Sequence, residues 1–233
     1  MIRPLCLLFD CDGTLVDSEP LLAAEMAACL TRLGLPFQAS DYIGEFRGSR
    51  FRNIVAELEE RYGGVDPQQL AETETEMRSN LNRRLETELA AIAGAREALM
   101  SLLDYPCGVV SNGPENKIRT SLQAIGFADF FETRLFSGYT ANCWKPDPRL
   151  YLHAAAAMGF DPEDCVAIDD ALVGVKAALD AGMTVIHLNR FPDAEETPEG
   201  AIMISSMFQL PTVIENLAHA RARESQRQVA IGR

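Results

Sequence analysis

The sequence predicts an α/β protein in which a doubly wound parallel sheet carries an inserted helical unit. Short apolar runs, each bounded by Gly, Asp, Asn or Pro, recur along the chain with helical stretches between them. This is the pattern of buried parallel strands and their crossover helices. After the first run, roughly a hundred residues show helical periodicity and no convincing strand, which is far more chain than one crossover needs.

The predicted strands are the apolar runs at residues 5–9, 107–110, 134–136, 165–168 and 184–188. Helices are predicted between the later strands, at residues 116–125, 148–158 and 172–181. The last two helices end at Gly159 and Gly182, and glycine is a common left-handed stop at the end of a helix. This alternation favours one discontinuous core domain, formed by residues 1–15 and 91–233.

The inserted helical unit is predicted at residues 16–90, with helices at 21–33, 51–62 and 67–89. Helical periodicity resumes at 95–103, so Gly94 lies near the return to the main domain. Residues 189–200 hold two prolines and four acids and are interpreted as a surface loop. Residues 221–233 carry four arginines and are interpreted as a solvated helix end.

The composition disfavours several classes of function. Asp and Glu number 34 against 21 Lys and Arg, a formal charge of −13, which argues against nucleic acid or an anionic membrane as the main partner. No apolar run approaches the ~20 residues of a membrane span or the core of a signal peptide. The six cysteines lack the spacing of zinc and redox motifs, so we interpret them as reduced thiols. We expect a monomer in the cytoplasm.

Polar side chains follow the predicted strands at the points where the strands end. They are Asp10 and Asp12 after the first strand, Ser111 after the second, Lys145 beyond the third, and Asp169 and Asp170 after the fourth. Because the carboxyl ends of parallel strands meet at one edge of a sheet, we expect these side chains to converge. Four carboxylates at one edge need a cation, and hard oxygen ligands suit Mg²⁺. Taken alone, the first two acids are also compatible with capping a turn.

These residue types together suit phosphoryl transfer. The carboxylate of Asp10 is able to attack phosphorus, while Asp12 protonates the leaving alkoxide and then deprotonates water. The Ser111 hydroxyl and the backbone N–H of Asn112 suit a phosphate at a helix start, and the Lys145 ammonium offsets negative charge. Each also has an ordinary structural interpretation, as a turn residue for Ser111 and a solvated side chain for Lys145.

Four segments, DCDGTLVDSEP, VVSNG, WKPDP and AIDDALVGVKAALDAGM, resemble the motifs of one known family and stand in the family's order. The chain is similar to haloacid dehalogenase-like phosphohydrolases with a helical cap, and the resemblance covers essentially the whole chain. It implies a Rossmann-like core, Asp10 as nucleophile, Asp12 as general acid and base, and Ser111 and Lys145 as phosphate stabilisers. A carboxylate at Asp12 favours a phosphatase or phosphomutase over a dehalogenase.

The same resemblance implies a metal site. It implies Mg²⁺ held by Asp10, the backbone carbonyl of Asp12, and Asp170, with Asp169 nearby or also a ligand. One residue departs from the family pattern: Ser often follows the paired acids, whereas this chain has Ala171. That departure puts one supporting hydrogen bond in question but not the metal itself.

The segments EFRG, VVSNGPENK, FSGY and WKPDP resemble the 6-phosphogluconate phosphatase and beta-phosphoglucomutase-like branch of the family. This implies small phosphorylated sugars or sugar acids as substrates, with 6-phosphogluconate as the first choice and Arg47 of the cap as a binding residue. A sugar phosphomutase of the beta-phosphoglucomutase type is the alternative enzyme. A catalytically silent binding or sensor protein is the alternative of another class, and the complete set of reactive residues argues against it.

Overall fold

The chain divides into two compact units. The structure, a computed structural model, describes residues 5–46, 49, 51–193 and 195–231. The first unit is Met1–Val16 together with Ala91–Arg233, and the second is Asp17–Ala90. Val16 and Ala91 pair through an isolated antiparallel bridge, so the chain leaves and re-enters the first unit at neighbouring points.

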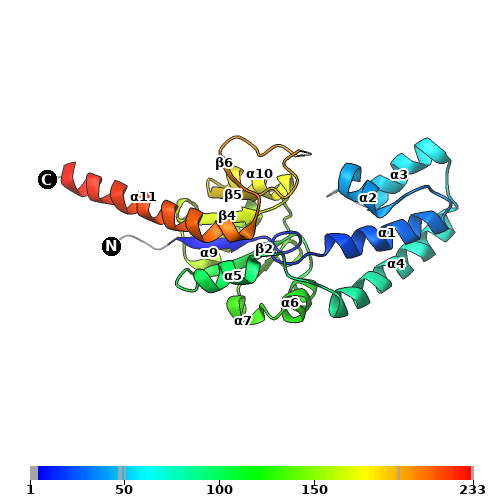
Figure 1. Cartoon of the computed structure of the whole chain (residues 1–233), viewed down its shortest axis with the longest axis horizontal. Coiled ribbons are helices and arrows are strands. Elements are labelled where there is room, and N and C mark those ends of the chain that lie inside the picture. Colours follow the sequence, from blue (N-terminus) through cyan, green and yellow to red (C-terminus); the bar gives the residue numbers. More distant parts are fainter. Residues whose placement is uncertain (1–4, 47–48, 50, 194, 232–233) are drawn as a thin grey trace. The chain divides into compact units, whose positions relative to one another are not determined.

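The first unit is built on a six-stranded parallel sheet with the order β3-β2-β1-β4-β5-β6 (Figure 1). The strands are β1 (Cys6–Phe9), β2 (Cys107–Ser111), β3 (Leu135–Ser137), β4 (Cys165–Asp169), β5 (Thr184–Leu188) and β6 (Ala201–Ile204). The chain winds outward from β1 in one direction through β2 and β3, then crosses to β4 and winds the other way. The reversal lies beside β1, and in such sheets ligands bind outside the carboxyl ends of the strands at this point.

Helices cover the sheet of the first unit. They are α5 (Ala95–Ser101), α6 (Glu115–Ala124), α7 (Ala128–Phe131), α8 (Gly138–Ala141), α9 (Arg149–Met158), α10 (Leu172–Asp180) and α11 (Leu210–Ile231). Alternate residues of a strand point to opposite faces, and Leu8 of β1 and Ala167 of β4 share one core with α9 and α10. Phe9 contacts Phe131 of α7 edge-on, with ring centroids 5.9 Å apart.

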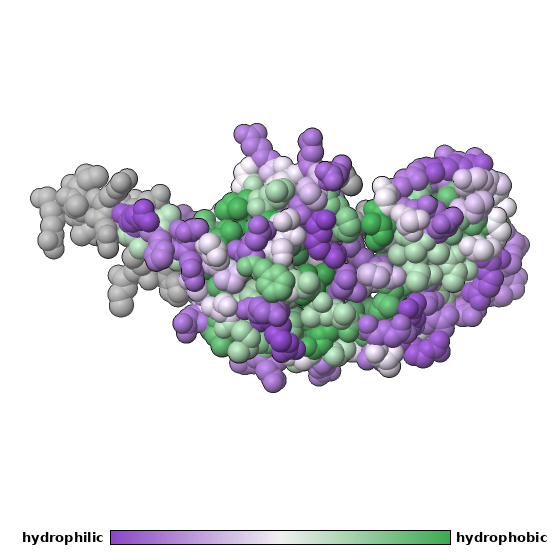
Figure 2. All heavy atoms as spheres, viewed as in Figure 1, coloured by the Kyte–Doolittle hydropathy of each residue, from purple (hydrophilic) through white to green (hydrophobic). Residues whose placement is uncertain are grey.

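The second unit is helical and has its own core. Its elements are α1 (Glu19–Arg32), α2 (Ala39–Asp41), a π-helical turn (Tyr42–Phe46), α3 (Phe51–Tyr62) and α4 (Pro67–Thr87). Asp66 caps α4 by accepting from the Gln69 N–H at 2.8 Å, and Pro67 occupies the first turn, where its missing N–H costs nothing. Leu30, Ile54 and Leu58 lie in the buried cluster, whereas the outer side of α4 is hydrophilic (Figure 2).

The predicted fold class is confirmed, with differences at the far edge of the sheet. β6 is absent from the predicted strands, because its short run, Ala201–Ile204, directly follows the Pro- and acid-rich loop and only Ile204 is buried. All six cysteines are free thiols. None of the described helices combines the length and the apolar character needed to cross a bilayer.

Candidate active site

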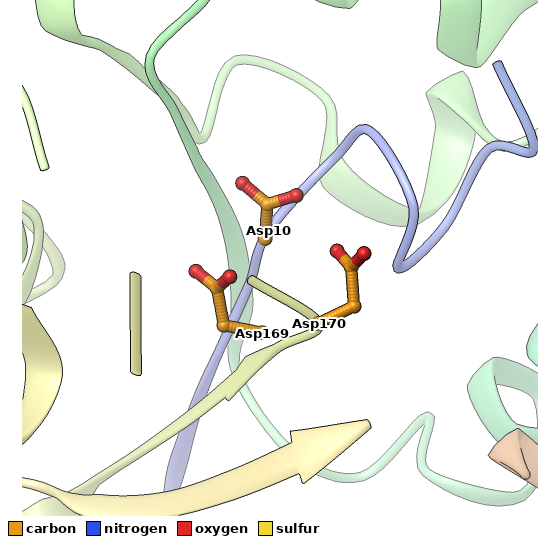
Figure 3. Close-up of side chains that lie close together, drawn as sticks. All are labelled: Asp10, Asp169 and Asp170. Atoms are coloured by element: carbon orange, nitrogen blue, oxygen red, sulfur yellow. The ribbon is translucent and has the colours of Figure 1, made fainter. Parts of the chain in front are cut away.

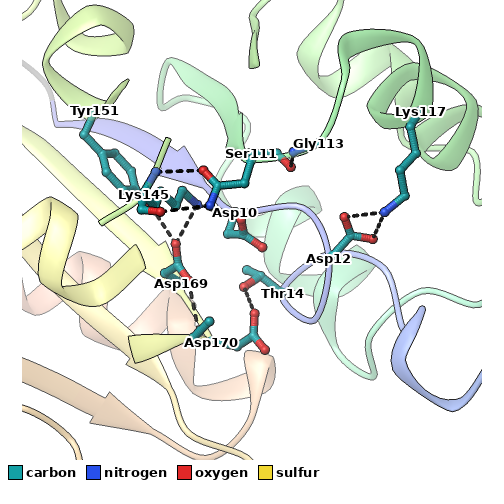
Figure 4. Close-up of polar contacts among 12 residues, drawn as sticks. Asp10, Asp12, Thr14, Ser111, Gly113, Lys117, Lys145, Tyr151, Asp169 and Asp170 are labelled. Atoms are coloured by element: carbon teal, nitrogen blue, oxygen red, sulfur yellow. Dashed lines mark hydrogen bonds and ion pairs between the residues drawn. The ribbon is translucent and has the colours of Figure 1, made fainter. Parts of the chain in front are cut away.

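Four segments bring polar side chains to the carboxyl edge of the sheet (Figure 4). Asp10 follows β1, Ser111 ends β2, and Asp169 ends β4. Lys145 comes from the loop between α8 and α9. The side chains of all four are nearly excluded from solvent, although their sequence positions are separated by tens of residues. The shared direction of the strands therefore assembles the site.

Three carboxylates form a candidate metal centre. Asp10, Asp169 and Asp170 each place one carboxylate oxygen within 4.8 Å of the others (Figure 3). Thr14 Oγ1 donates to Asp170 Oδ1 at 3.0 Å, and the backbone N–H of Ala171 donates to Asp169 Oδ1 at 3.0 Å. These donors orient the two carboxylates. At position 171 the donor is the backbone N–H of an alanine, so no serine side chain is needed for this bond.

Two glycines make room for this cluster. A Cβ atom on Gly13 would lie 2.2 Å from Asp170 Oδ2, and one on Gly174 would lie 1.9 Å from Asp169 Oδ2. Gly13 also adopts φ +92°, a conformation that residues with a side chain rarely take. The carboxylates thus approach the backbone at points where only glycine fits.

Lys145 neutralises part of the cluster. Its Nζ donates to Asp10 Oδ1 at 2.6 Å and to Asp169 Oδ2 at 2.7 Å, and Tyr151 Oη also donates to Asp169 Oδ2, at 2.8 Å. Burial lowers the pKa of Lys145, but the charges of Asp10 and Asp169 outweigh it and raise that pKa well above its usual value. Lys145 is therefore a buried cation directed at both carboxylates, and not the solvated side chain of its alternative interpretation.

Asn112 holds Lys145 in place. Its Oδ1 accepts from the Lys145 backbone N–H at 2.7 Å, and its Nδ2 donates to the Lys145 carbonyl at 3.1 Å. The Asn112 side chain therefore clamps a peptide backbone. The sequence predicts that the backbone N–H of Asn112, and not its side chain, binds the substrate phosphate. That contact stays a prediction.

Ser111 combines a turn role with a position in the site. Its hydroxyl oxygen accepts from the Gly113 N–H at 3.0 Å, and the Gly113 carbonyl accepts from Ser137 Oγ at 2.7 Å. These bonds fix the turn that leads into α6. The Ser111 side chain is also buried at the end of β2, at the edge of the sheet where the predicted phosphate contact would form.

The buried carboxyl of Asp10 has an altered proton affinity. Burial raises the pKa of Asp10 to about 7, Lys145 opposes that shift, and the neighbouring Asp169 adds to it. A raised pKa is expected where several carboxylates share a buried site. A divalent cation would compete with this proton for the carboxylate.

Asp12 is not part of the three-carboxylate cluster. Its two oxygens accept from Lys117 Nζ of α6 at 3.0 and 2.9 Å (Figure 4). Burial lowers the pKa of Lys117, but the charge of Asp12 outweighs it and raises that pKa. The structure thus separates the carboxylate of Asp12, predicted as acid and base, from the three carboxylates that could hold a metal, and its backbone carbonyl stays a predicted ligand.

Sequence reasoning missed Lys117. The one signal was its place in the first turn of a predicted helix, where the positive end of the helix dipole disfavours a cation. A carboxylate partner offsets this cost. Tyr151 was missed as well, since nothing in an apolar helical stretch indicates that a tyrosine donates to Asp169. Arg47, the predicted cap residue, lies outside the described residues and stays a prediction.

The charges of the site fit a divalent cation. Four carboxylates, of Asp10, Asp12, Asp169 and Asp170, face two ammonium groups, of Lys145 and Lys117. Two negative charges remain, which one divalent ion balances. The donors are all hard oxygens, the ligands that Mg²⁺ prefers. The residues present therefore fit a magnesium ion.

Comparison with known proteins gives a consistent picture. The family described as haloacid dehalogenase-like hydrolase matches residues 5–182. The 6-phosphogluconate phosphatase of Escherichia coli (strain K12) is 38% identical over 189 residues, covering 80% of this chain and 83% of that protein. Hexitol phosphatase B of the same strain is 28% identical over 214 residues, covering 88% and 94%. A crystal structure of a haloacid dehalogenase-like protein of unknown function from Agrobacterium tumefaciens is 30% identical, with a TM-score of 0.79, covering 93% of this chain and 100% of that chain.

Proposed function

The chain belongs to the haloacid dehalogenase-like hydrolase family and is a phosphoric monoester hydrolase of the sugar-phosphate type, and from this premise we propose that it hydrolyses 6-phosphogluconate with the help of Mg²⁺. The reaction passes through an aspartyl-phosphate on Asp10. The arrangement that carries this proposal is the buried set of Asp10, Lys145, Asp169 and Asp170, with Asp12 held apart on Lys117.

Magnesium has a defined place in this proposal. Asp10, Asp170 and the backbone carbonyl of Asp12 would hold the ion, with Asp169 beside them or also a ligand. Asp169 already accepts from Lys145 and Tyr151, which supports a role in fixing that lysine. When bound, Mg²⁺ supplies positive charge that stabilises the phosphoryl oxygens as the transition state forms.

The first step transfers the phosphoryl group to the protein. Asp12 first takes up a proton from solvent. The Asp10 carboxylate then attacks phosphorus, the P–O bond to the sugar oxygen breaks, and Asp12 donates this proton to the departing oxygen. Lys145 donates to Asp10 Oδ1, so it orients the nucleophile and offsets negative charge in the transition state. The Ser111 hydroxyl and the Asn112 N–H bind the phosphoryl oxygens.

The second step returns the protein to its starting state. Asp12, now a carboxylate, removes a proton from a water molecule, whose oxygen attacks phosphorus. The bond between phosphorus and Asp10 breaks, inorganic phosphate leaves, and the Asp10 carboxylate is regenerated. The one group that gives and takes the proton is Asp12, which is 30% exposed at its side chain and so accessible to water.

The choice of 6-phosphogluconate rests on similarity. The 38% identity to the phosphatase of that name from Escherichia coli exceeds the 28% identity to hexitol phosphatase B. A sugar acid carries a carboxylate in addition to its phosphate, and an arginine such as Arg47 is able to bind it through two parallel hydrogen bonds. The six free thiols support a reducing compartment, which we propose is the cytoplasm.

The decisive experiment measures inorganic phosphate release from 6-phosphogluconate, hexitol phosphates, other sugar phosphates and nucleotides, with Mg²⁺ and with a chelator. We expect Mg²⁺-dependent release with the highest kcat/KM for 6-phosphogluconate. Metal-dependent release spread over other phosphates would keep the chemistry and reject the substrate. Isomerised sugar phosphate without free phosphate would support the mutase, and binding without turnover would support the silent sensor.

Asp10→Asn tests the nucleophile. We expect kcat to fall by more than about 10³-fold, because an amide oxygen does not form the aspartyl-phosphate. The matched control is Asp180→Asn, the same change at an exposed position of α10, which should turn over like the unaltered protein. Thermal unfolding would establish that both variants are folded, and turnover by folded Asp10→Asn would reject the assignment of Asp10.

A further inference from the structure

We propose that Lys117 is a positioning residue that holds the carboxylate of Asp12 away from the three-carboxylate cluster of Asp10, Asp169 and Asp170. In this role it reserves Asp12 for proton transfer and prevents the Asp12 side chain from becoming a further metal ligand. The inference rests on the proposed function, since it takes Asp12 to be the acid and base of that reaction.

The geometry separates two groups of acids. Lys117 Nζ donates to both oxygens of Asp12, at 3.0 and 2.9 Å, so one ammonium contacts both oxygens of the carboxylate. In Figure 4 the Asp12 carboxylate turns toward Lys117 and away from Asp169 and Asp170. The side chain of Asp12 is 30% exposed, whereas those of Asp10 and Asp169 are 12% and 1% exposed. Of these three acids, Asp12 is therefore the most open to water.

The separation matters because the Asp12 carboxylate has two competing possible roles, as a metal ligand and as the acid and base. Asp12 is two residues from Asp10, and its backbone carbonyl is an expected metal ligand, so its carboxylate is tethered close to the cation. A divalent cation attracts carboxylates strongly at short range in a partly buried site. A carboxylate bound to the metal would take up a proton poorly, because the divalent charge strongly favours its ionised form. Lys117 supplies a competing attraction on the opposite side.

The two site lysines thus have different tasks. Lys145 contacts Asp10 and Asp169 and belongs to the metal cluster and the nucleophile. Lys117 donates to both oxygens of Asp12 and belongs to the predicted acid and base. The chain has only one further lysine, Lys176, which is exposed on α10. That residue offers a matched control.

The test compares Lys117→Met with Lys117→Arg, and with Lys176→Met as the control. We expect Lys117→Met to lower kcat by about 10- to 100-fold, part of the usual contribution of acid–base catalysis, with KM within about twofold. Lys117→Arg keeps the cation and should restore most of kcat. Lys176→Met should match the unaltered protein. If Lys117→Met does not fold, Lys117→Gln, which keeps a hydrogen-bond donor, takes its place.

The second readout is metal binding without substrate. Titration of Mg²⁺ by calorimetry should show that Lys117→Met binds the ion at least about threefold more tightly, because the Asp12 carboxylate is released toward it. Loss of a nearby positive charge alone would also tighten binding. The same change is therefore made in an Asp12→Asn background, where only the charge effect remains and the gain in affinity should be clearly smaller.

Several outcomes would overturn the inference. These are an equal gain in metal affinity in both backgrounds, an unchanged or weakened affinity in Lys117→Met, or a raised KM with an unchanged kcat, which would make Lys117 a substrate ligand. Failure of the proposed function is distinguishable, because it would appear as no phosphate release by the unaltered protein. The metal titrations would still decide whether Lys117 positions Asp12.

Discussion

The side chains of the site depend on one another through shared acceptors. Asp169 accepts from Lys145, Tyr151 and the Ala171 N–H. Lys145 in turn bridges Asp169 and Asp10, and Asn112 fixes its backbone. A buried polar network is stable when every member has a partner, so each of these residues constrains the position of the Asp10 carboxylate.

Mg²⁺ binding should strengthen as pH rises through neutrality. The pKa of Asp10 is raised from 3.8 to about 7, first by burial. In the metal-free protein, protonated Asp10 thus contributes stability that is present below about pH 4 and is lost as pH rises through 7. Because Mg²⁺ needs the carboxylate, its affinity should rise with pH by up to about tenfold per unit below that pKa.

The measurement is the thermal midpoint with and without a fixed concentration of Mg²⁺, at pH 6 and at pH 8. We expect the Mg²⁺-induced increase in the midpoint to be larger at pH 8. Asp10→Asn should lose most of this pH dependence. An equal increase at both pH values in the unaltered protein would contradict the raised pKa of Asp10.

At the scale of elements, the ends of strands and helices meet to shape the site. β1 and β4 are paired with Phe9 opposite Ile168, so Asp10 and Asp169 leave the sheet side by side. α10 starts at Leu172, and only Ala171 separates it from the paired acids. Its residue Gly174 allows this helix to approach the Asp169 carboxylate closely.

Gly174→Ala should damage the metal site. Alanine favours a helix over glycine by about 1 kcal/mol, but here its Cβ would lie 1.9 Å from Asp169 Oδ2. The carboxylate or the helix must move, which we expect to lower the free energy of unfolding by about 1–3 kcal/mol. Mg²⁺ affinity should fall by about tenfold or more.

Denaturant unfolding and Mg²⁺ titration would test this expectation. Gly64→Ala is the control, because a Cβ there meets only the Glu59 side chain, at 3.9 Å. That variant should keep the stability and Mg²⁺ affinity of the unaltered protein within error. If Gly174→Ala also kept both, the close approach of α10 to Asp169 would have no functional importance.

At the scale of the whole molecule, the two units have separate hydrophobic cores. One cluster lies entirely within the second unit and includes Leu30 of α1. Another joins β1, β4, α9 and α10 and includes Leu8. Both leucines are fully buried. Because the two clusters share no residue, a cavity made in one core should lower the stability of its own unit first.

Leu30→Ala should therefore loosen the helical unit and leave the metal site intact. A buried Leu→Ala change costs about 2–5 kcal/mol. We expect faster amide hydrogen exchange in α1, α3 and α4, with unchanged exchange in β1 and β4 and unchanged Mg²⁺ affinity. Leu8→Ala is the matched change in the first unit and should show the reverse pattern. Equal acceleration in both units by either variant would mean that the molecule unfolds as one body.

The sequence by itself determined the class of fold and several of the side chains that gather at the carboxyl edge of the sheet. Short continuous apolar runs identified the strands, and apolar residues at helical spacing identified the helices. Both patterns are readable because the buried face of each element repeats within its own segment. Asp10, Ser111 and Asp169 were identifiable because parallel strands place their carboxyl ends at one edge. The helical stretch before residue 91 was visible because a single crossover does not need so much chain.

Only the tertiary structure decided how these residues are held. Lys117 and Asp12 are 105 residues apart, Asn112 and Lys145 are 33 apart, and Tyr151 and Asp169 are 18 apart. No local pattern pairs such residues, since the contacts depend on which strands and helices become neighbours. The sequence predicted which groups are reactive because the chemistry of a group is a property of its side chain, whereas the pairing of Asp12 with Lys117 and of Asp10 and Asp169 with Lys145 is a property of the fold.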